Sequence, residues 1–217
     1  MENSFRPVGR REVTSPAESI SAAEQTRAAR IGAAFFRHRS WLPIFFLVIV
    51  LFAPGTPTPL HWAVGVVLVV IGEAYRMSGV AAAGTETRRR SRAVQRLVTY
   101  GVFSWSRNPL YNGNFLIWMG FVVISGVLWF LPVAIVLFAI EYSFIVRYEE
   151  GVLESIFGEE YLAYKRRTPR WLPRPSPSVS PEDGYHWGEA WRSEISTFLQ
   201  YLVLMIAFYV KSRYPRT

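Results

Sequence analysis

The stretch that decides the fold begins with LVTYGVFSWSRNPLYNGNFLIWMG (residues 97–120) and ends with RYEEGVLESIFGEEYLAYKRRTPRWLP (residues 147–173). The apolar run between these two segments is long enough to cross a membrane and return. A chain that crosses and returns brings both of its polar segments to the same side. The stretch therefore predicts a membrane hairpin with aromatic, acidic and basic residues gathered at one bilayer surface, an arrangement suited to a binding site.

The composition is that of a membrane protein. Hydrophobic residues make up 51% of the 217 residues and charged residues only 18%, against about 25% in soluble domains. Cysteine is absent, which excludes disulfides, thiolate metal sites and cysteine nucleophiles. The three histidines lie far apart in the sequence, so we expect no metal site. The formal net charge of +8 lies in clusters beside apolar runs, which favours membrane topology over nucleic-acid binding.

The apolar runs predict an all-α, polytopic membrane protein. Four runs are expected to form its core transmembrane helices, at residues 41–53, 61–83, 114–125 and 127–147. A fifth apolar segment, at 195–210, is short for a span and either crosses the membrane or lies in its interface. The chain accordingly divides into a polar N-terminal tail or surface helix (1–30), a membrane domain (31–172), a Pro- and Ser-rich linker (173–194), and a C-terminal hydrophobic helix with a basic tail (195–217).

The charged loops predict the orientation in the membrane. Arginines cluster at 88–96, and loops rich in Lys and Arg stay on the cytoplasmic side. The turns at 54–60 and 125–131 carry no charge and are expected on the far side. This orientation places the 84–110 loop and the 147–194 region at the cytoplasmic surface, and the predicted site with them.

Three charged residues lie inside predicted spans, where charge is costly and normally faces protein or a polar cavity. Glu73 and Arg76 are three residues apart on one helical face and either neutralise each other or lie beneath the site. Glu141 lies in the fourth span and faces either the site or a neighbouring helix.

Residues 99–114 have chemistry suited to a polar ligand. Their glycines allow the backbone to approach a ligand closely, and Arg107 offers a planar fork of donors for a carboxylate. Pro109 frees nearby carbonyls, and Tyr111 adds an aromatic face with a hydroxyl. At the other end of the hairpin, the acids at 149–150 can accept hydrogen bonds from a ribose or an ammonium group. The combination suits a zwitterionic ligand that carries a nucleoside.

Both segments also carry a spaced pattern. The first is Leu-Val-Thr-x-Gly-x-Phe-x-x-x-Arg-Asn-Pro-x-Tyr-x-Gly, over residues 97–113, and the second is Arg-x-Glu-Glu-x-x-Leu-x-x-x-Phe-Gly-x-x-Tyr-x-x-Tyr, over residues 147–164. The patterns resemble the motifs of the integral-membrane methyltransferases of the isoprenylcysteine carboxyl methyltransferase and phospholipid N-methyltransferase group. In that group the first motif has tyrosine where this chain has Phe103 and histidine where it has Asn108. The resemblance covers residues 60–173.

The resemblance implies S-adenosylmethionine as the cofactor, bound without a Rossmann glycine loop, which this sequence lacks. It implies that both motifs contact the cofactor, through Thr99, Gly101, Arg107, Asn108, Pro109, Tyr111, Gly113, Glu149 and Glu150. It also implies that Arg147 and the following segment cover the cofactor or orient the substrate, with Tyr161, Tyr164, Arg167, Arg170 and Trp171 as substrate candidates. Asn108 is harmless if the family's histidine serves through its backbone, and changes the mechanism if its imidazole takes a proton.

The chemistry needs little from the protein. Methyl transfer from a sulfonium is an in-line displacement, for which alignment supplies most of the acceleration. A carboxylate acceptor is already a nucleophile, whereas an amine must lose a proton, for which Glu150 or Glu141 is the candidate base. The candidate catalytic residues are Arg147, Glu150 and Glu141.

We therefore expect an S-adenosylmethionine-dependent methyltransferase of the bacterial inner membrane or an equivalent membrane. It would act at the cytoplasmic surface on a membrane lipid or a lipid-modified substrate, through a carboxylate or an amine. The alternative is a non-catalytic assembly or transport factor on the same scaffold, which Asn108 and the extra C-terminal segment favour. The sequence predicts neither the acceptor atom nor the oligomeric state.

Overall fold

The computed structural model describes residues 31–32, 34–35, 37, 42–84, 96–175 and 184–213. The predicted N-terminal tail (1–30) and the arginines at 88–92 lie outside the described residues.

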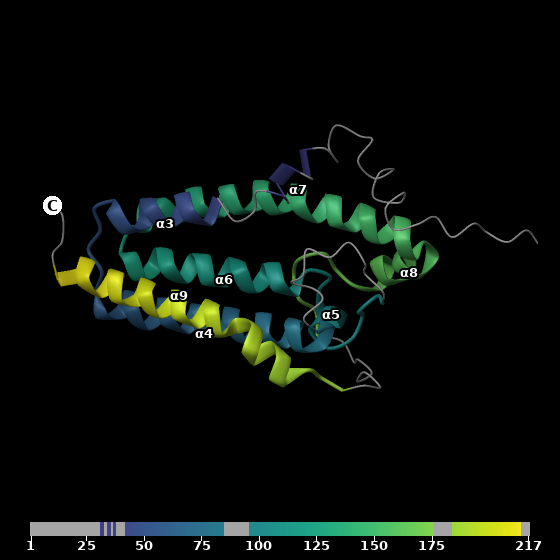
Figure 1. The fold of residues 1–217 in the computed structure, drawn as a ribbon. Helices are drawn as coiled ribbons and strands as arrows, with labels where there is room; N and C mark the ends of the chain where they lie inside the picture. The colour runs from purple at the N-terminus through teal and green to yellow at the C-terminus, as the bar shows by residue number, and fades with distance from the viewer. Residues whose placement is uncertain are drawn as a thin grey trace, which may run out of the picture.

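The described secondary structure is entirely helical, which confirms the all-α prediction. The elements are α3 (Leu42–Phe52), α4 (Pro59–Ala83), α5 (Val102–Trp105), α6 (Pro109–Ser125), the 3-10 helix η2 (Leu128–Phe130), α7 (Leu131–Phe157), α8 (Glu159–Arg167) and α9 (Trp187–Arg213). The long helices run roughly along one axis, and the short α5 and α8 lie at one end of the bundle (Figure 1). α9 ends at the other end of the bundle.

The helices at the four predicted core spans differ in length. Two of them, α4 and the continuous η2–α7 stretch, are long and apolar enough to cross a membrane, whereas α3 is a shorter apolar helix. α6 has 17 residues, or about 26 Å at 1.5 Å per residue, against a hydrocarbon thickness of about 30 Å. It is short because Pro109 occupies its first turn and Gly126, in the left-handed region with φ 71°, ends it. The protein is a polytopic membrane protein in which the short α6 packs between the longer α4 and α7.

α9 favours a membrane crossing over an interfacial position for the C-terminal segment. It has 27 residues, is long and apolar enough to cross a membrane, and begins at Trp187, within the predicted linker. It packs along α4 and reaches the far end of the bundle (Figure 1). There the Lys211 ammonium donates to the carbonyl of Val50 near the end of α3, at 2.6 Å. The basic end of α9 therefore lies on the side opposite α8.

Two pairs of glycines bring α4 and α6 into close contact. A Cβ atom on Gly120 would lie 2.7 Å from the carbonyl oxygen of Gly65, and one on Gly113 would lie 2.6 Å from the carbonyl oxygen of Gly72. Within each helix the two glycines are seven residues apart, which is two turns, so they share one face. Small residues on one face allow membrane helices to approach backbone to backbone. The α4–α6 pair is therefore the closely packed centre of the bundle.

Replacing Gly120 with alanine is expected to destabilise the protein by about 1–3 kcal/mol, because the new methyl group would overlap backbone on α4. Thermal unfolding in detergent measures the effect. Gly151→Ala on α7 is the matched control, since a Cβ there meets nothing within 4 Å, and helix propensity alone predicts a gain of roughly 0.5–1 kcal/mol. Equal effects of the two substitutions would contradict the close packing.

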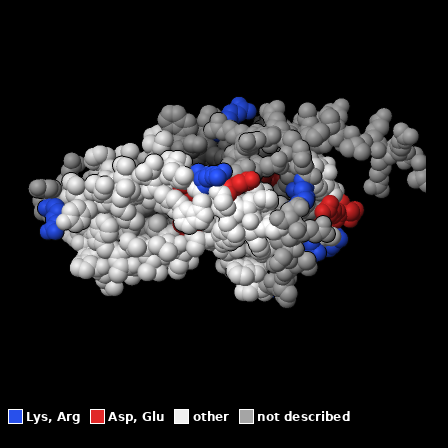
Figure 2. All heavy atoms as spheres, turned by 60° about the horizontal axis from the view of Figure 1, so that its bottom comes forward, with Lys and Arg blue, Asp and Glu red and all other residues white. Residues whose placement is uncertain are grey.

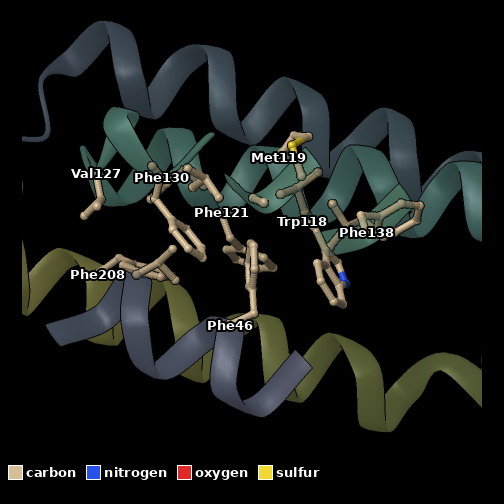
Figure 3. Packing of buried hydrophobic residues seen from close by; sticks show 14 of the residues in the cluster. Phe46, Trp118, Met119, Phe121, Val127, Phe130, Phe138 and Phe208 are labelled. Atoms are coloured by element: carbon tan, nitrogen blue, oxygen red, sulfur yellow. The ribbon is translucent and has the colours of Figure 1, made fainter. Parts of the chain in front are cut away.

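The apolar core is dominated by aromatic side chains from four helices. Trp118 of α6 contacts Phe46 of α3, with ring centroids 4.5 Å apart, and Phe138 of α7, with centroids 5.4 Å apart. Phe121 of α6 stacks on Phe208 of α9 at 5.9 Å (Figure 3). Such large buried rings contribute much of the packing energy of a core. These contacts pack α6 against α3, α7 and α9 in the apolar part of the bundle, and the first turn of α6 lies beyond them at the polar end.

Charge is distributed unevenly over the surface. On the face drawn in Figure 2, the half that ends in a blue tip is otherwise white except for a little red near the middle of the molecule, and the other charged side chains of described residues gather from the middle toward the opposite end. Large apolar side chains of α4, α7 and α9 are exposed, among them Val70, Val136 and Leu202. An exposed apolar belt between charged ends is the surface expected of a protein that sits in a bilayer.

Candidate functional site

The two polar ends of the predicted hairpin meet in space. The turn that precedes α6 lies against the loop that follows α8, although the two are about sixty residues apart in sequence. The Arg107 amide donates to the carbonyl of Pro169 at 2.9 Å, and the Arg174 amide donates to that of Trp105 at 3.0 Å. Asn112 Nδ2 donates to the carbonyl of Trp171 at 2.7 Å. Residues 105–112 and 165–174 thus form one polar wall at the end of the bundle that carries α5 and α8.

A buried carboxylate joins the two halves of this wall. Glu150 of α7 accepts from Arg107 Nε at 3.1 Å and Nη2 at 2.9 Å. It also accepts from Arg170 Nε at 3.1 Å and Nη2 at 2.6 Å. Charge-assisted forks of this kind are among the strongest side-chain hydrogen bonds. We call Arg107, Glu150 and Arg170 the clamp.

Arg107 extends the clamp to the end of α8. Its Nη1 donates to the carbonyls of Lys165 at 3.0 Å and Thr168 at 2.6 Å. Its side chain is only 9% exposed, and that of Glu150 is 7% exposed. The Arg107 guanidinium, which the sequence predicts to contact the cofactor, is therefore bonded to protein groups on both of its edges.

Glu149 is the more accessible of the two neighbouring acids. It is half-buried, whereas Glu150 is buried. The Tyr111 hydroxyl donates to Glu149 Oε1 at 2.8 Å, and the Tyr111 ring packs on Tyr142 with centroids 4.7 Å apart. α6 and α7 therefore position this carboxylate together, at the edge of the wall.

Asn108 has a defined structural role. Its Nδ2 donates to the carbonyl of Arg170 at 3.0 Å, and its own amide donates to Ser106 Oγ at 3.2 Å. Ser106 is fully buried and also accepts from Asn112 Nδ2 at 3.0 Å. A neutral histidine can likewise donate one ring N–H, so Asn108 can replace it in this contact. Sequence reasoning missed Ser106; its signal was a small hydroxyl residue two positions before an Asn-Pro turn.

The tyrosines of α8 are packing residues. Tyr161 and Tyr164 are buried, and the Tyr164 hydroxyl donates to the carbonyl of Phe103 at 2.7 Å. Burial raises the pKa of both phenols above the ordinary tyrosine value, so they remain neutral. Tyr164 joins α8 to α5 through its bond to Phe103, and the role of both tyrosines as substrate contacts stays a prediction.

A basic pocket opens beside the clamp. It has a volume of about 490 Å³ and is lined by Arg107, Lys165, Arg166, Arg167, Thr168, Pro169, Leu172, Pro173 and Arg174. This volume falls within the range of small-molecule sites. The pocket offers cations to a carboxylate or a phosphate, and the exposed Leu172 offers an apolar contact.

The predicted glycines of the site face protein. Gly101 has φ +60°, and a Cβ there would lie 3.0 Å from the Tyr185 hydroxyl oxygen. The space beside Gly113 is filled by Arg76 and Gly72. The sequence predicted that these glycines make room for a ligand. Instead, Gly101 makes room for the segment before α9, and Gly113 makes room for α4. Pro109 is buried in the first turn of α6, and Thr99 is half-buried in the preceding loop.

Two predicted catalytic residues are not brought to the clamp. Arg147 is exposed on α7, with no ion pair to any described acid. Glu141 is 0% exposed, its carboxylate oxygens have no hydrogen-bond partner, and it lies nine residues before Glu150, or about 13 Å along the helix. Within the described part of the chain, no group of three or more His, Asp or Glu side chains has the arrangement of a metal site.

Residues 60–160 match the phospholipid methyltransferase family. The chain is 30% identical to protein-S-isoprenylcysteine O-methyltransferase B of Arabidopsis thaliana over 139 residues, which cover 59% of this chain and 68% of the relative. It is 34% identical to the protein-S-isoprenylcysteine O-methyltransferase of Mus musculus over 119 residues, or 51% of this chain and 41% of the relative. It is also 34% identical to the human protein of the same name over 117 residues, which cover 50% of this chain and 40% of the relative. The chain thus spans about two fifths of the length of the mammalian relatives, and no solved structure matches it significantly.

Proposed function

Because this chain belongs to the phospholipid and isoprenylcysteine methyltransferase family, we propose that it transfers a methyl group from S-adenosylmethionine to a lipid-modified carboxylate at the membrane surface. The cofactor supplies an electrophilic methyl group on a sulfonium. The protein's task is to hold the donor and the acceptor in line.

The residues at the polar wall fit such a cofactor. Glu149, half-buried beside Tyr111, suits the ribose hydroxyls or the ammonium group. The basic pocket, which shares Arg107 with the clamp, suits the carboxylate of the amino-acid part, through Lys165, Arg167 or Arg174. The clamp would hold these two regions at a fixed separation, because Arg107 and Arg170 come from opposite halves of the wall.

The ion pairs of Glu150 with Arg107 and Arg170 bear on which group accepts the methyl. An amine acceptor needs a base, and the two candidates were Glu150 and Glu141. Glu150 is held by two arginines, and Glu141 is sealed inside the bundle. A carboxylate acceptor needs no base, which agrees with the O-methyltransferase names of the relatives. We therefore favour methyl ester formation over amine methylation.

Charge and hydropathy support a cytoplasmic site in an inner or equivalent membrane. The end of the bundle that carries the wall has Lys165, Arg166, Arg167, Arg170 and Arg174, whereas the described part of the other end has Lys211 and Arg213. Basic segments stay preferentially on the cytoplasmic side. A lipid chain attached to the substrate would lie in the bilayer beside the exposed apolar faces of α4 and α7.

Labelled cofactor tests the proposal directly. The protein in nanodiscs is expected to transfer labelled methyl groups to an S-prenylated cysteine and not to phosphatidylethanolamine. A methyl ester releases its label as methanol in mild base, whereas an N-methyl group is stable, so the product identifies the acceptor atom. Base-stable label would overturn the carboxylate assignment. Absence of transfer and of calorimetric cofactor binding in folded protein would favour a non-catalytic factor on the same scaffold.

A further inference from the structure

Arg76 of α4 is the centre of a buried polar network that the proposed reaction does not use. Its Nη2 donates to Glu194 of α9, at 3.0 Å from Oε1 and 3.1 Å from Oε2. Its Nε lies 3.3 Å from Glu73 Oε2, and its Nη1 donates to Asn114 Oδ1 at 2.6 Å. The Glu194 side chain is 0% exposed and that of Arg76 is 14% exposed. One guanidinium thereby joins α4, α6 and α9 inside the bundle.

The network continues from Asn114 to the candidate site. Asn114 Nδ2 lies 3.4 Å from the Tyr142 hydroxyl on α7. The Tyr142 ring packs on Tyr111, whose hydroxyl donates to Glu149. A continuous series of contacts therefore runs from Glu194 on the C-terminal helix to Glu149, the half-buried acid that accepts from Tyr111 of the wall.

Two features indicate that Arg76 does more than balance a buried acid. The guanidinium faces two acids, Glu73 and Glu194, yet its shortest bond goes to the uncharged Asn114. Gly113 also leaves room for the arginine stem, since a Cβ there would lie 2.5 Å from Arg76 Cγ. A lysine presents one point charge and lacks the fixed fork that reaches three groups at once.

We propose that Arg76 is a positioning residue for the cofactor site and that α9 holds it in place through Glu194. The contact fixes the second turn of α6 at Asn114, next to the first turn, where Tyr111 donates to Glu149 of α7. α9 lies outside residues 60–160, which match the family. The inference rests on the proposed function in one respect: it takes Glu149 to contact the cofactor.

Two substitutions break the network at different places. Asn114→Ala removes the link to α6 and leaves the ion pair between Arg76 and Glu194 intact. Glu194→Met keeps the length of the side chain and removes both acceptor oxygens. Phe208→Ala is the control, because it weakens the packing of α9 on α6 far from the network. Hydrogen exchange over residues 106–116 without ligand and calorimetric affinity for S-adenosylmethionine are the two readouts.

Asn114→Ala and Glu194→Met are each expected to speed exchange over residues 106–116 and to weaken cofactor binding, both by about tenfold. Phe208→Ala is expected to lower thermal stability and leave both readouts within about twofold of the parent protein. If Phe208→Ala changes the readouts as much as the network variants, α9 is only a packing element and the inference fails. If Glu194→Met does not fold, Asn114→Ala decides. A parent protein that does not bind cofactor refutes the proposed function, while the exchange readout still decides the positioning role.

Discussion

Glu150→Gln is expected to lower the free energy of unfolding by about 3 kcal/mol and to reduce methyl transfer at least about 100-fold. The substitution places an amide NH₂ where Arg107 or Arg170 now donates, so donors would face donors. It also leaves two guanidinium groups without their shared counter-charge. The stability estimate is at the low end for a broken buried pair, because the Arg170 side chain is 38% exposed.

Glu154→Gln is the matched control for this prediction. It makes the same chemical change one turn further along α7, where Glu154 pairs with Lys165 at 2.8 Å and the side chains are 42% and 29% exposed. Exposed pairs of this kind contribute roughly 0–1 kcal/mol. Thermal unfolding and cofactor turnover, measured on both variants in one detergent, separate the clamp from a general effect of removing acid. If both variants lose the same free energy of unfolding, the clamp does not stabilise the fold more than an exposed ion pair does.

Hydropathy predicted where the helices lie better than how long they are. The apolar runs locate α4 and α7. The predicted membrane hairpin correctly placed residues near 107 and 150 at the same end of the bundle. The length of α6 could not be predicted from hydropathy, since it depends on Pro109 and on the left-handed Gly126. The start of α9 was missed because Trp187 to Glu194 is too polar to be read as part of a span.

Side-chain partners were harder to predict than positions in the fold. Two adjacent acids at 149–150 were placed in the site, but which of them faces the arginines depends on the phase of α7 against its neighbours. The pairing of Gly113 with Gly72 could have been suspected from the seven-residue spacing of glycines in both helices. The contact between Arg76 and Glu194 joins residues 118 apart, and no local pattern carries that information.

The structure gives Asn108 a role that the motif comparison could not. Its amide group joins the turn before α6 to the Arg170 carbonyl, within the same wall that the clamp closes. A side chain used as a donor to backbone needs no imidazole. The departure from the family's histidine therefore removes a possible proton acceptor and keeps a structural contact, which agrees with an acceptor that needs no base.

Glu149→Gln is expected to weaken cofactor binding at least about 30-fold while leaving the free energy of unfolding within roughly 0.5 kcal/mol of the parent value. Stability should be retained because the Tyr111 hydroxyl can donate to an amide oxygen as it does to the carboxylate. Binding should weaken because a ribose hydroxyl or an ammonium group would then donate to a neutral amide oxygen in place of a charged carboxylate. Isothermal calorimetry with S-adenosylmethionine and with S-adenosylhomocysteine measures both the size and the origin of the loss.

The comparison of the two ligands identifies what Glu149 contacts. They share the ribose, the ammonium group and the carboxylate, and differ in the sulfonium charge and its methyl group. Equal losses for both ligands would place Glu149 at the ribose or the ammonium group, whereas a larger loss for S-adenosylmethionine would place it near the sulfonium. Tyr111→Phe is the control, since it keeps the carboxylate and removes only the hydroxyl that orients it, so a smaller loss of about fivefold is expected. A Glu149→Gln variant that binds both ligands as the parent does would exclude Glu149 from the site, and the basic pocket beside the clamp would then be the part of the wall left to hold the cofactor.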